Sequence, residues 1–276
     1  MYYLGIDAGG SAVKLIAADS EGNITAKRKY ALDLSEERLR KEIAEMLSEY
    51  GIGGSPEQIY HTGASSDMVR NAIGAQPNTY FEEFPCFAAG AQKLSGISKA
   101  IAVSMGTGTA FVAADGDKYT HIGGSGVGGG TLSGLARLTL GVTDDNEVNR
   151  LIRSGNTSRV DLTIGDICKD NLGGLSADVT AANFGSRRMS EAPEDIAAGL
   201  SNMIFQTAGI MAAFACKGTD TTKAVFVGAM AEIPEGKAVL EGVGALHGLD
   251  FSIPENAAYA GALGAVLNGL RKEKSR

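Results

Sequence analysis

The chain has 276 residues, enough for two modest domains or one large domain with a substantial buried core. Hydrophobic residues make up 44% and charged residues 21%, as is ordinary for a soluble globular protein, and the net charge of −7 argues against a nucleic-acid partner. The three cysteines, Cys86, Cys168 and Cys216, are scattered, so they indicate neither a disulfide framework nor a zinc site. No signal peptide precedes the first predicted strand, and we therefore expect a cytoplasmic protein.

The first predicted strand ends in a glycine turn that suits a phosphate group. Residues 4–14 read LGIDAGGSAVK, in which residues 9–11 (the first glycine turn) separate two apolar strands. Glycines let the backbone approach a ligand, and successive N–H groups form an anion-binding concavity. Asp7 suits Mg²⁺, which prefers oxygen ligands, and Lys14 adds a charge for phosphate. An ordinary hairpin with a solvated Asp7 and Lys14 is the alternative that this stretch leaves open.

The next segments predict the rest of an N-terminal sheet and its first helix. Residues 2–32 predict a meander of three strands. Ser35 suits an N-cap, and the apolar stripe of the following helix ends near Gly51. A short strand over residues 59–62 then leads into a Gly-Ala-Ser-Ser segment, in which Ser65 is a candidate substrate contact.

Two adjacent carboxylates, Glu82 and Glu83, follow an aromatic segment that we expect to be a strand. Because neighbours on a strand point to opposite faces, one of the two would face inward. A carboxylate beside Phe81, Phe84 and Phe87 would be partly desolvated, which raises its pKa and makes it a better general base. A pair of surface glutamates is the alternative, and the residues alone favour it.

A second unit has the same order as the first: an apolar strand, a glycine turn and another apolar strand. Residues 101–111 read IAVSMGTGTAF, and the hydroxyls of Thr107 and Thr109 suit phosphate within the second glycine turn (residues 106–109). Two such units predict related domains, here 1–95 and 96–276, whose turns face each other across a cleft. This arrangement resembles the acetate and sugar kinase, Hsp70 and actin superfamily, an α/β fold of two actin-like (ribonuclease H-like) domains. Neither turn contains the GxxxxGK[ST] pattern of a P-loop.

A glycine-rich run, GGSGVGGGT over residues 123–131, precedes a predicted helix over 132–141. Such a run would be too flexible for structure unless it lies against another part of the protein. The helix would open at the triple glycine and direct free N–H groups at an anion. A linker is the alternative, although linkers rarely stand between a strand and a helix at this spacing.

Residues 196–216 carry no charge, and their hydropathy alone would suggest a membrane span. Polar residues interrupt the run, and Pro193 marks a helix start before it. We therefore expect a core or subunit-interface helix and no membrane association. A buried strand over residues 224–227 then leads into Gly228, and a helix of small residues covers 257–270.

Motifs along nearly the whole chain together resemble the type II pantothenate kinases. They are IDAGGSAVK (6–14), EEF (82–84), MGTGTA (105–110), GGSGVGGGT (123–131), ADVTAANFG (177–185), VFVGAMA (225–231) and ENAAYAGALGA (255–265). The glycine run followed by TAANFG is the most specific part of the match. The resemblance implies a homodimeric enzyme that uses ATP and Mg²⁺ to phosphorylate pantothenate, the first step of coenzyme A synthesis.

The resemblance also assigns roles to single residues. Glu83 falls where the family has its catalytic base, His121 and Ser65 are expected substrate contacts, and Asp7 is the expected metal ligand. The expected nucleotide contacts are Asp7, Ala8, Gly9, Gly10, Ser11, Ala12, Val13, Lys14, Thr107, Gly129, Gly130, Thr131, Leu132, Ser133, Gly228 and Ala229. Together they would support direct phosphoryl transfer, with Glu83 taking the proton of the attacking hydroxyl.

The chain also departs from the family's pattern. His121 stands where the family usually has Arg, which resembles a phosphate or substrate clamp, while Ser104 replaces a usual Asn and Pro85 a usual Asp. His121 therefore keeps open a kinase for another small hydroxyl compound. A non-kinase ATPase or activator of the same superfamily is a further alternative, although the hydratase activators use bridging cysteines for an iron–sulfur cluster and no clustered cysteines exist here.

Overall fold

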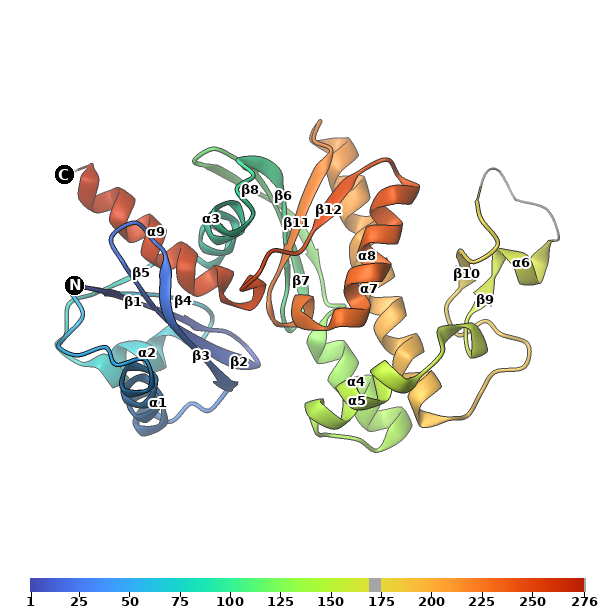
Figure 1. Cartoon of the computed structure of the whole chain (residues 1–276), viewed down its shortest axis with the longest axis horizontal. Helices are drawn as coiled ribbons and strands as arrows, with labels where there is room; N and C mark the ends of the chain where they lie inside the picture. The colour runs from blue at the N-terminus through green and yellow to red at the C-terminus, as the bar shows by residue number, and fades with distance from the viewer. Residues whose placement is uncertain (169–174, 276) are drawn as a thin grey trace.

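The computed structural model describes residues 1–168 and 175–275, and it contains two five-stranded sheets with helices around and between them (Figure 1). The first sheet has the order β3-β2-β1-β4-β5. Its strands are β1 (Tyr3–Ala8), β2 (Ala12–Ala18), β3 (Ile24–Ala31), β4 (Ile59–Thr62) and β5 (Asn78–Tyr80). The first three strands are antiparallel, which confirms the predicted meander, and β4 and β5 run parallel to β1.

Helices cover both faces of the first sheet. Apolar side chains of α1 (Glu36–Glu49) and α2 (Ser66–Ile73) pack on one face, and α9 (Ala260–Lys274) packs on the other. The hydroxyl of Ser35 accepts a hydrogen bond from the Arg38 N–H at 3.2 Å, so Ser35 caps α1 as its sequence predicts.

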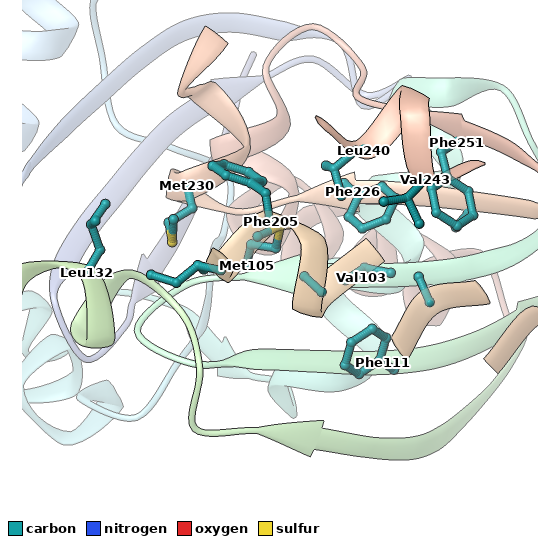
Figure 2. Close-up of a cluster of buried hydrophobic side chains, with 14 of the residues drawn as sticks. Val103, Met105, Phe111, Leu132, Phe205, Phe226, Met230, Leu240, Val243 and Phe251 are labelled. Carbon is teal, nitrogen blue, oxygen red and sulfur yellow. The ribbon is translucent and has the colours of Figure 1, made fainter. Parts of the chain in front are cut away.

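The second sheet has the order β12-β11-β6-β7-β8. Its strands are β6 (Lys99–Met105), β7 (Thr109–Asp115), β8 (Lys118–Ser125), β11 (Lys223–Val227) and β12 (Asp250–Ser252). One face packs on α4 (Gly129–Leu140), α5 (Asp145–Ser154), α7 (Pro193–Gly218) and α8 (Pro234–Leu246). Phe111, Phe205 and Phe226 point into the core between this face and its helices (Figure 2).

Helix α3 (Glu83–Ser95) lies between the two sheets, with α9 beside it (Figure 1). The two helices approach through glycines: a Cβ at Gly90 would lie 2.0 Å from the Ala260 carbonyl oxygen, and one at Gly264 would lie 1.6 Å from that of Cys86. Because α9 also packs on the first sheet, the division of the chain into 1–95 and 96–276 stays a prediction.

The expected strand through Glu82 and Glu83 is wrong. Strand β5 ends at Tyr80, and Glu83 is the first residue of α3. Proline is tolerated in the first turn of a helix, where backbone N–H groups lack intrahelical partners, so Pro85 was the local signal for this helix start.

The long apolar helix α7 is a core helix. It is long and apolar enough to cross a membrane, yet 67% of its most apolar stretch is buried inside the protein. A small lobe precedes it, built from η1 (Thr157–Arg159), β9 (Leu162–Thr163), α6 (Ile164–Ile167) and β10 (Thr180–Ala182). Two further short helices, η2 (Ala229–Glu232) and η3 (Ala257–Tyr259), follow β11 and β12.

Candidate active site

The first sheet and the second sheet, each with its helices, form the two halves of the molecule. A cleft of about 380 Å³ lies between these halves and is lined by both glycine turns. The sequence-predicted residues that line it are Asp7, Gly9, Gly10, Ser11, Lys14, Glu83, Thr107, Thr109, His121, Gly228 and Ala229. Residues from distant parts of the chain therefore meet here, as the repeated strand–turn–strand pattern predicts.

Asp7 and Lys14 face each other across the β1–β2 ladder and form the charged floor of the cleft. Lys14 Nζ lies 3.6 Å from Asp7 Oδ2, and the side chains are only 9% and 14% exposed. The alternative of a hairpin with solvated charges is therefore wrong. Glycines leave room for the carboxylate, because a Cβ at Gly63 or Gly261 would lie 2.9 Å or 2.6 Å from an Asp7 carboxylate oxygen.

The two glycine turns approach each other closely. A Cβ on Gly10 would lie 3.1 Å from the Thr107 hydroxyl oxygen, so a larger residue at position 10 would press on the second turn. Thr107 is exposed, whereas Thr109 is buried and its hydroxyl donates to the Val127 carbonyl at 2.8 Å. Of the two predicted hydroxyl ligands, Thr107 is thus the one presented to solvent.

The glycine-rich run forms backbone hydrogen bonds with the second glycine turn. The N–H groups of Gly129 and Gly130 donate to the carbonyls of Gly106 and Thr107 at 2.8 and 2.9 Å. The expectation that the run lies against another segment is confirmed. The expectation of free N–H groups is wrong at Gly129 and Gly130, because these donors already have protein partners.

Glu83 lines the cleft from the start of α3, whereas Glu82 occupies the N-cap position without a side-chain capping hydrogen bond and does not line the cleft. Burial by surrounding atoms raises the pKa of Glu83, the Asp7 charge raises it further, and Lys14 opposes both. Glu83 is nevertheless an exposed residue, so the surrounding atoms crowd its carboxylate without excluding water. A carboxylate with a raised pKa is suited to general-base catalysis near neutral pH.

An aromatic wall stands beside Glu83. The ring of Phe84 stacks on the imidazole of His121, with centroids 4.2 Å apart and an interplanar angle of 6°. Phe87 meets Phe84 edge-on with centroids 6.1 Å apart. All three residues line the cleft, and one face of the His121 ring is covered by Phe84.

Gly228 lies where the second sheet meets the cleft. Its φ is +95°, and a Cβ there would lie 2.6 Å from the Met105 carbonyl oxygen, so both backbone conformation and space favour glycine. Gly228 and Ala229, which the family resemblance assigns to the nucleotide, begin the turn into η2. We call residues 228–232 the adenosine turn.

Several predicted contacts lie outside the cleft lining. Ala8, Val13 and Leu132 have side chains in the hydrophobic cores. The Ser65 N–H donates to the Ala8 carbonyl at 2.9 Å, and Ser133 donates its hydroxyl proton to Asp145 at 3.1 Å. The remaining predicted residues outside the lining are Ala12, Gly129, Gly130 and Thr131. Their contact with a ligand stays a prediction.

The structure also brings in residues that sequence reasoning did not assign, among them Ser104, Ala258, Ala260 and Gly261. The last three belong to the ENAAYAGALGA segment, whose resemblance to a family motif was the available signal. Gly261 lies beside Asp7 because of how α9 crosses the first sheet, which local sequence does not specify.

Asp7 fits a magnesium ion that arrives with a nucleotide. Among the described residues no group of three or more His, Cys, Asp or Glu side chains is placed to hold a metal. Mg²⁺ is commonly bound through one or two carboxylates together with substrate phosphates, and the nearly buried Asp7 beside the two glycine turns provides that donor set.

Solved structures with the same fold include a dehydratase component and a sugar kinase. One is component A of the Acidaminococcus fermentans (R)-2-hydroxyglutaryl-CoA dehydratase, with a TM-score of 0.68 and 19% identity over 99% of each chain. Another is a ROK family glucokinase from Streptomyces griseus in complex with glucose and AMPPNP, with a TM-score of 0.62 and 14% identity over 96% of this chain and 98% of the other. These likenesses establish the two-domain actin-like α/β fold.

The sequence comparisons are more specific. The chain is 28% identical to a type II pantothenate kinase of Staphylococcus haemolyticus and 29% identical to one of Staphylococcus epidermidis, over 95% of this chain and 98% of each relative. A type II pantothenate kinase of Staphylococcus aureus is 26% identical over 96% of this chain and 99% of its own length. The sequence profile of the Fumble family matches residues 76–236, more than half of the chain. This protein belongs to the Fumble family.

Proposed function

We propose that this protein is a type II pantothenate kinase, which transfers the γ-phosphoryl group of ATP to the primary hydroxyl of pantothenate. The product is 4'-phosphopantothenate, and the reaction is the first step of coenzyme A synthesis. The observation that carries the proposal is the meeting of Asp7, Lys14 and Glu83 in one cleft between two facing glycine turns. The match to the Fumble family, and to relatives named as pantothenate kinases, supports it.

The nucleotide end of the cleft would be formed by the two glycine turns and the adenosine turn. Lys14 neutralises phosphate charge, and the Thr107 hydroxyl donates to a phosphate oxygen. Asp7 would hold Mg²⁺, which neutralises the charge of the phosphate oxygens when it is bound. Catalysis of this kind is mostly positioning and electrostatic stabilisation, and a cleft lined by Asp7, Lys14 and Glu83 would provide both.

Glu83 acts as the general base. As the substrate hydroxyl oxygen bonds to the γ-phosphorus, its proton passes to the Glu83 carboxylate, the bond between the γ-phosphorus and the bridging oxygen breaks, and ADP leaves. The raised pKa of Glu83 brings its basicity closer to the working pH.

The substrate end would be bounded by Phe84 and His121. A family Arg grips an anion with two parallel hydrogen bonds, whereas an imidazole offers one N–H at a time toward the cleft. The stacking of His121 on Phe84 fixes the plane in which that single bond is made. The same observation favours, as a second candidate, a kinase for a different small hydroxyl compound.

An ATP-consumption screen separates these candidates. Pantothenate, sugars and short hydroxy acids are offered one at a time to the purified protein with Mg²⁺. We expect turnover with pantothenate, and turnover with another hydroxyl compound alone would transfer the proposal to the second candidate. The activator alternative has less support, because Cys86 and Cys216 are buried in separate hydrophobic cores.

The proposal extends to assembly and location: a cytoplasmic homodimer without nucleic-acid or membrane partners. The homodimer rests on the resemblance to the family, and Leu138 of α4 and Phe214 of α7 are large apolar side chains that are 78% and 63% exposed. Size-exclusion chromatography with light scattering tests this, and a monomeric mass would contradict the dimer.

A further inference from the structure

Two lysines on the edge strand β3 connect the first sheet to the other half of the molecule. Lys29 forms an ion pair with Glu232, the last residue of the adenosine turn. Lys27 donates to the Asn256 side-chain oxygen at 2.5 Å, and its ammonium lies 5.8 Å from the centre of the Tyr259 ring. The partners come from the opposite end of the chain, so these contacts depend on how the two halves are placed.

The register of the first sheet aligns Lys29 in a row with Lys14 and Asp7, two charged residues that line the cleft. Asp7 stands opposite Lys14 on β1 and β2, and Lys14 stands opposite Lys29 on β2 and β3. Directly opposite residues of an antiparallel pair point to the same face. The three side chains therefore lie on the face of the sheet that carries the active-site charges.

This row has its own charge balance. Like charges directly opposite each other destabilise a sheet, and Lys14 and Lys29 are such a pair. Asp7 compensates Lys14 from the same sheet, and Glu232 compensates Lys29 from the other half of the molecule. The row Asp7, Lys14, Lys29 and Glu232 thus joins the floor of the cleft to the end of the adenosine turn.

Resting on the proposed kinase function, we propose that Lys29 and Glu232 are a positioning pair, which holds the adenosine turn against the first glycine turn. A bound nucleotide has to reach both turns at once, so their separation sets its affinity. The two side chains are 37% and 38% exposed, and an exposed ion pair contributes little free energy. Such a contact breaks easily, which suits a site that must release ADP on every turnover.

An ordinary surface role is the competing explanation. Lysines on an edge strand discourage strand pairing between molecules, and many surface ion pairs contribute nothing measurable. That explanation predicts no change in nucleotide affinity when either residue is neutralised. A direct contact between Lys29 and a phosphate predicts a loss for Lys29 alone.

The test measures ADP binding to the full-length protein by calorimetry in the presence of Mg²⁺, so it needs no phosphoryl acceptor. The variants are Lys29→Met, Glu232→Gln and the double charge swap Lys29→Glu with Glu232→Lys. Lys237→Met is the matched control, because Lys237 pairs with Glu241 inside the single helix α8. Thermal denaturation of each variant verifies folding.

Both neutral variants should weaken ADP binding by about two- to five-fold, although they change the net charge in opposite directions. The charge swap should restore most of the affinity, the control should leave it unchanged, and the KM for ATP should rise more than kcat falls. Loss with Lys29→Met alone, or unchanged affinity in both neutral variants, would overturn the positioning role. A wild-type protein that binds no ADP would instead overturn the proposed function, and this inference with it.

Discussion

Asp7 and Glu83 belong to different elements, β1 and α3, yet the negative charge of Asp7 helps to raise the pKa of Glu83. Lys14, whose ammonium lies 3.6 Å from the Asp7 carboxylate, acts in the opposite direction on the pKa of Glu83. The proposed metal ligand therefore acts electrostatically on the proposed base, and a change at Asp7 should be measurable in the titration of Glu83.

Replacing Glu83 with Gln should abolish phosphoryl transfer while leaving ADP binding intact. Removal of a general base typically costs about 10²–10⁴-fold in rate. Steady-state kinetics with pantothenate and calorimetry with ADP measure the two effects. Glu82→Gln is the matched control, because Glu82 precedes the same helix, makes no side-chain capping hydrogen bond and lies outside the cleft lining. Equal losses in both variants would show that the adjacent carboxylates have been given the wrong roles.

The activity should depend on pH through Glu83. The deprotonated carboxylate is the active form, so kcat/KM falls as the pH falls through its pKa, and a raised pKa moves this loss to higher pH than for an ordinary glutamate. Asp7→Asn removes a charge that raises this pKa. The acid limb of the residual activity should therefore move to lower pH, and a limb that stays in place or moves upward would contradict the coupling.

Asp7→Asn should also weaken the use of Mg²⁺. An amide is a poorer ligand than a carboxylate for a hard cation, and mass action offsets weaker binding when the ion concentration rises. Turnover of the variant should recover in part as Mg²⁺ is increased, over a range in which the wild type is saturated. A defect that is the same at every Mg²⁺ concentration would remove Asp7 from the metal site.

The crossing of α3 and α9 should tolerate no side chain at Gly264. An added Cβ would lie 1.6 Å from the Cys86 carbonyl oxygen, and overpacking of this kind costs about 1–3 kcal/mol. Gly264→Ala should therefore lower the melting temperature in a thermal scan. In Gly242→Ala, within α8, the new methyl meets no atom within 4 Å, so helix propensity should keep or raise stability. Similar behaviour of the two variants would contradict the close helix crossing.

His121 is the residue that most directly tests substrate choice. His121→Arg should lower the KM for pantothenate, because a guanidinium stays charged, stacks on Phe84 as the imidazole does, and adds a second hydrogen bond. His121→Ala should remove one hydrogen bond and raise the free energy of the transition state by about 0.5–1.5 kcal/mol, which is measured as a lower kcat/KM. Steady-state kinetics at fixed pH measure both. If only the Arg variant turns over pantothenate, the fold assignment stands and the natural substrate is a different hydroxyl compound.

Local patterns in the sequence were sufficient to locate both glycine turns. In each unit the two strands that flank the turn are neighbours in sequence and pair with each other. For Glu83 the predicted residue lines the cleft but the stated physical reason was wrong: the residue opens a helix, and helix geometry, not strand alternation, directs it there. Pro85 indicated that helix start more reliably than the aromatic residues before it.

Contacts between segments that are far apart in the sequence could not be predicted from local sequence patterns. The glycine at position 261 leaves room for Asp7 only because α9 returns to the first sheet, and the N–H groups of Gly129 and Gly130 serve the second glycine turn instead of an anion. The pairing of Lys29 with Glu232 likewise depends on the relative placement of the two halves. In each case the sequence supplies the right residue types but not their partners.

The central claim is that this cleft moves a phosphoryl group from ATP to pantothenate. Phosphorus NMR of the wild-type protein with ATP, Mg²⁺ and pantothenate follows both products in one sample. The account predicts ADP and 4'-phosphopantothenate in equal amounts. ADP accompanied by inorganic phosphate and no phosphorylated pantothenate, or ATP left unconsumed, would contradict it.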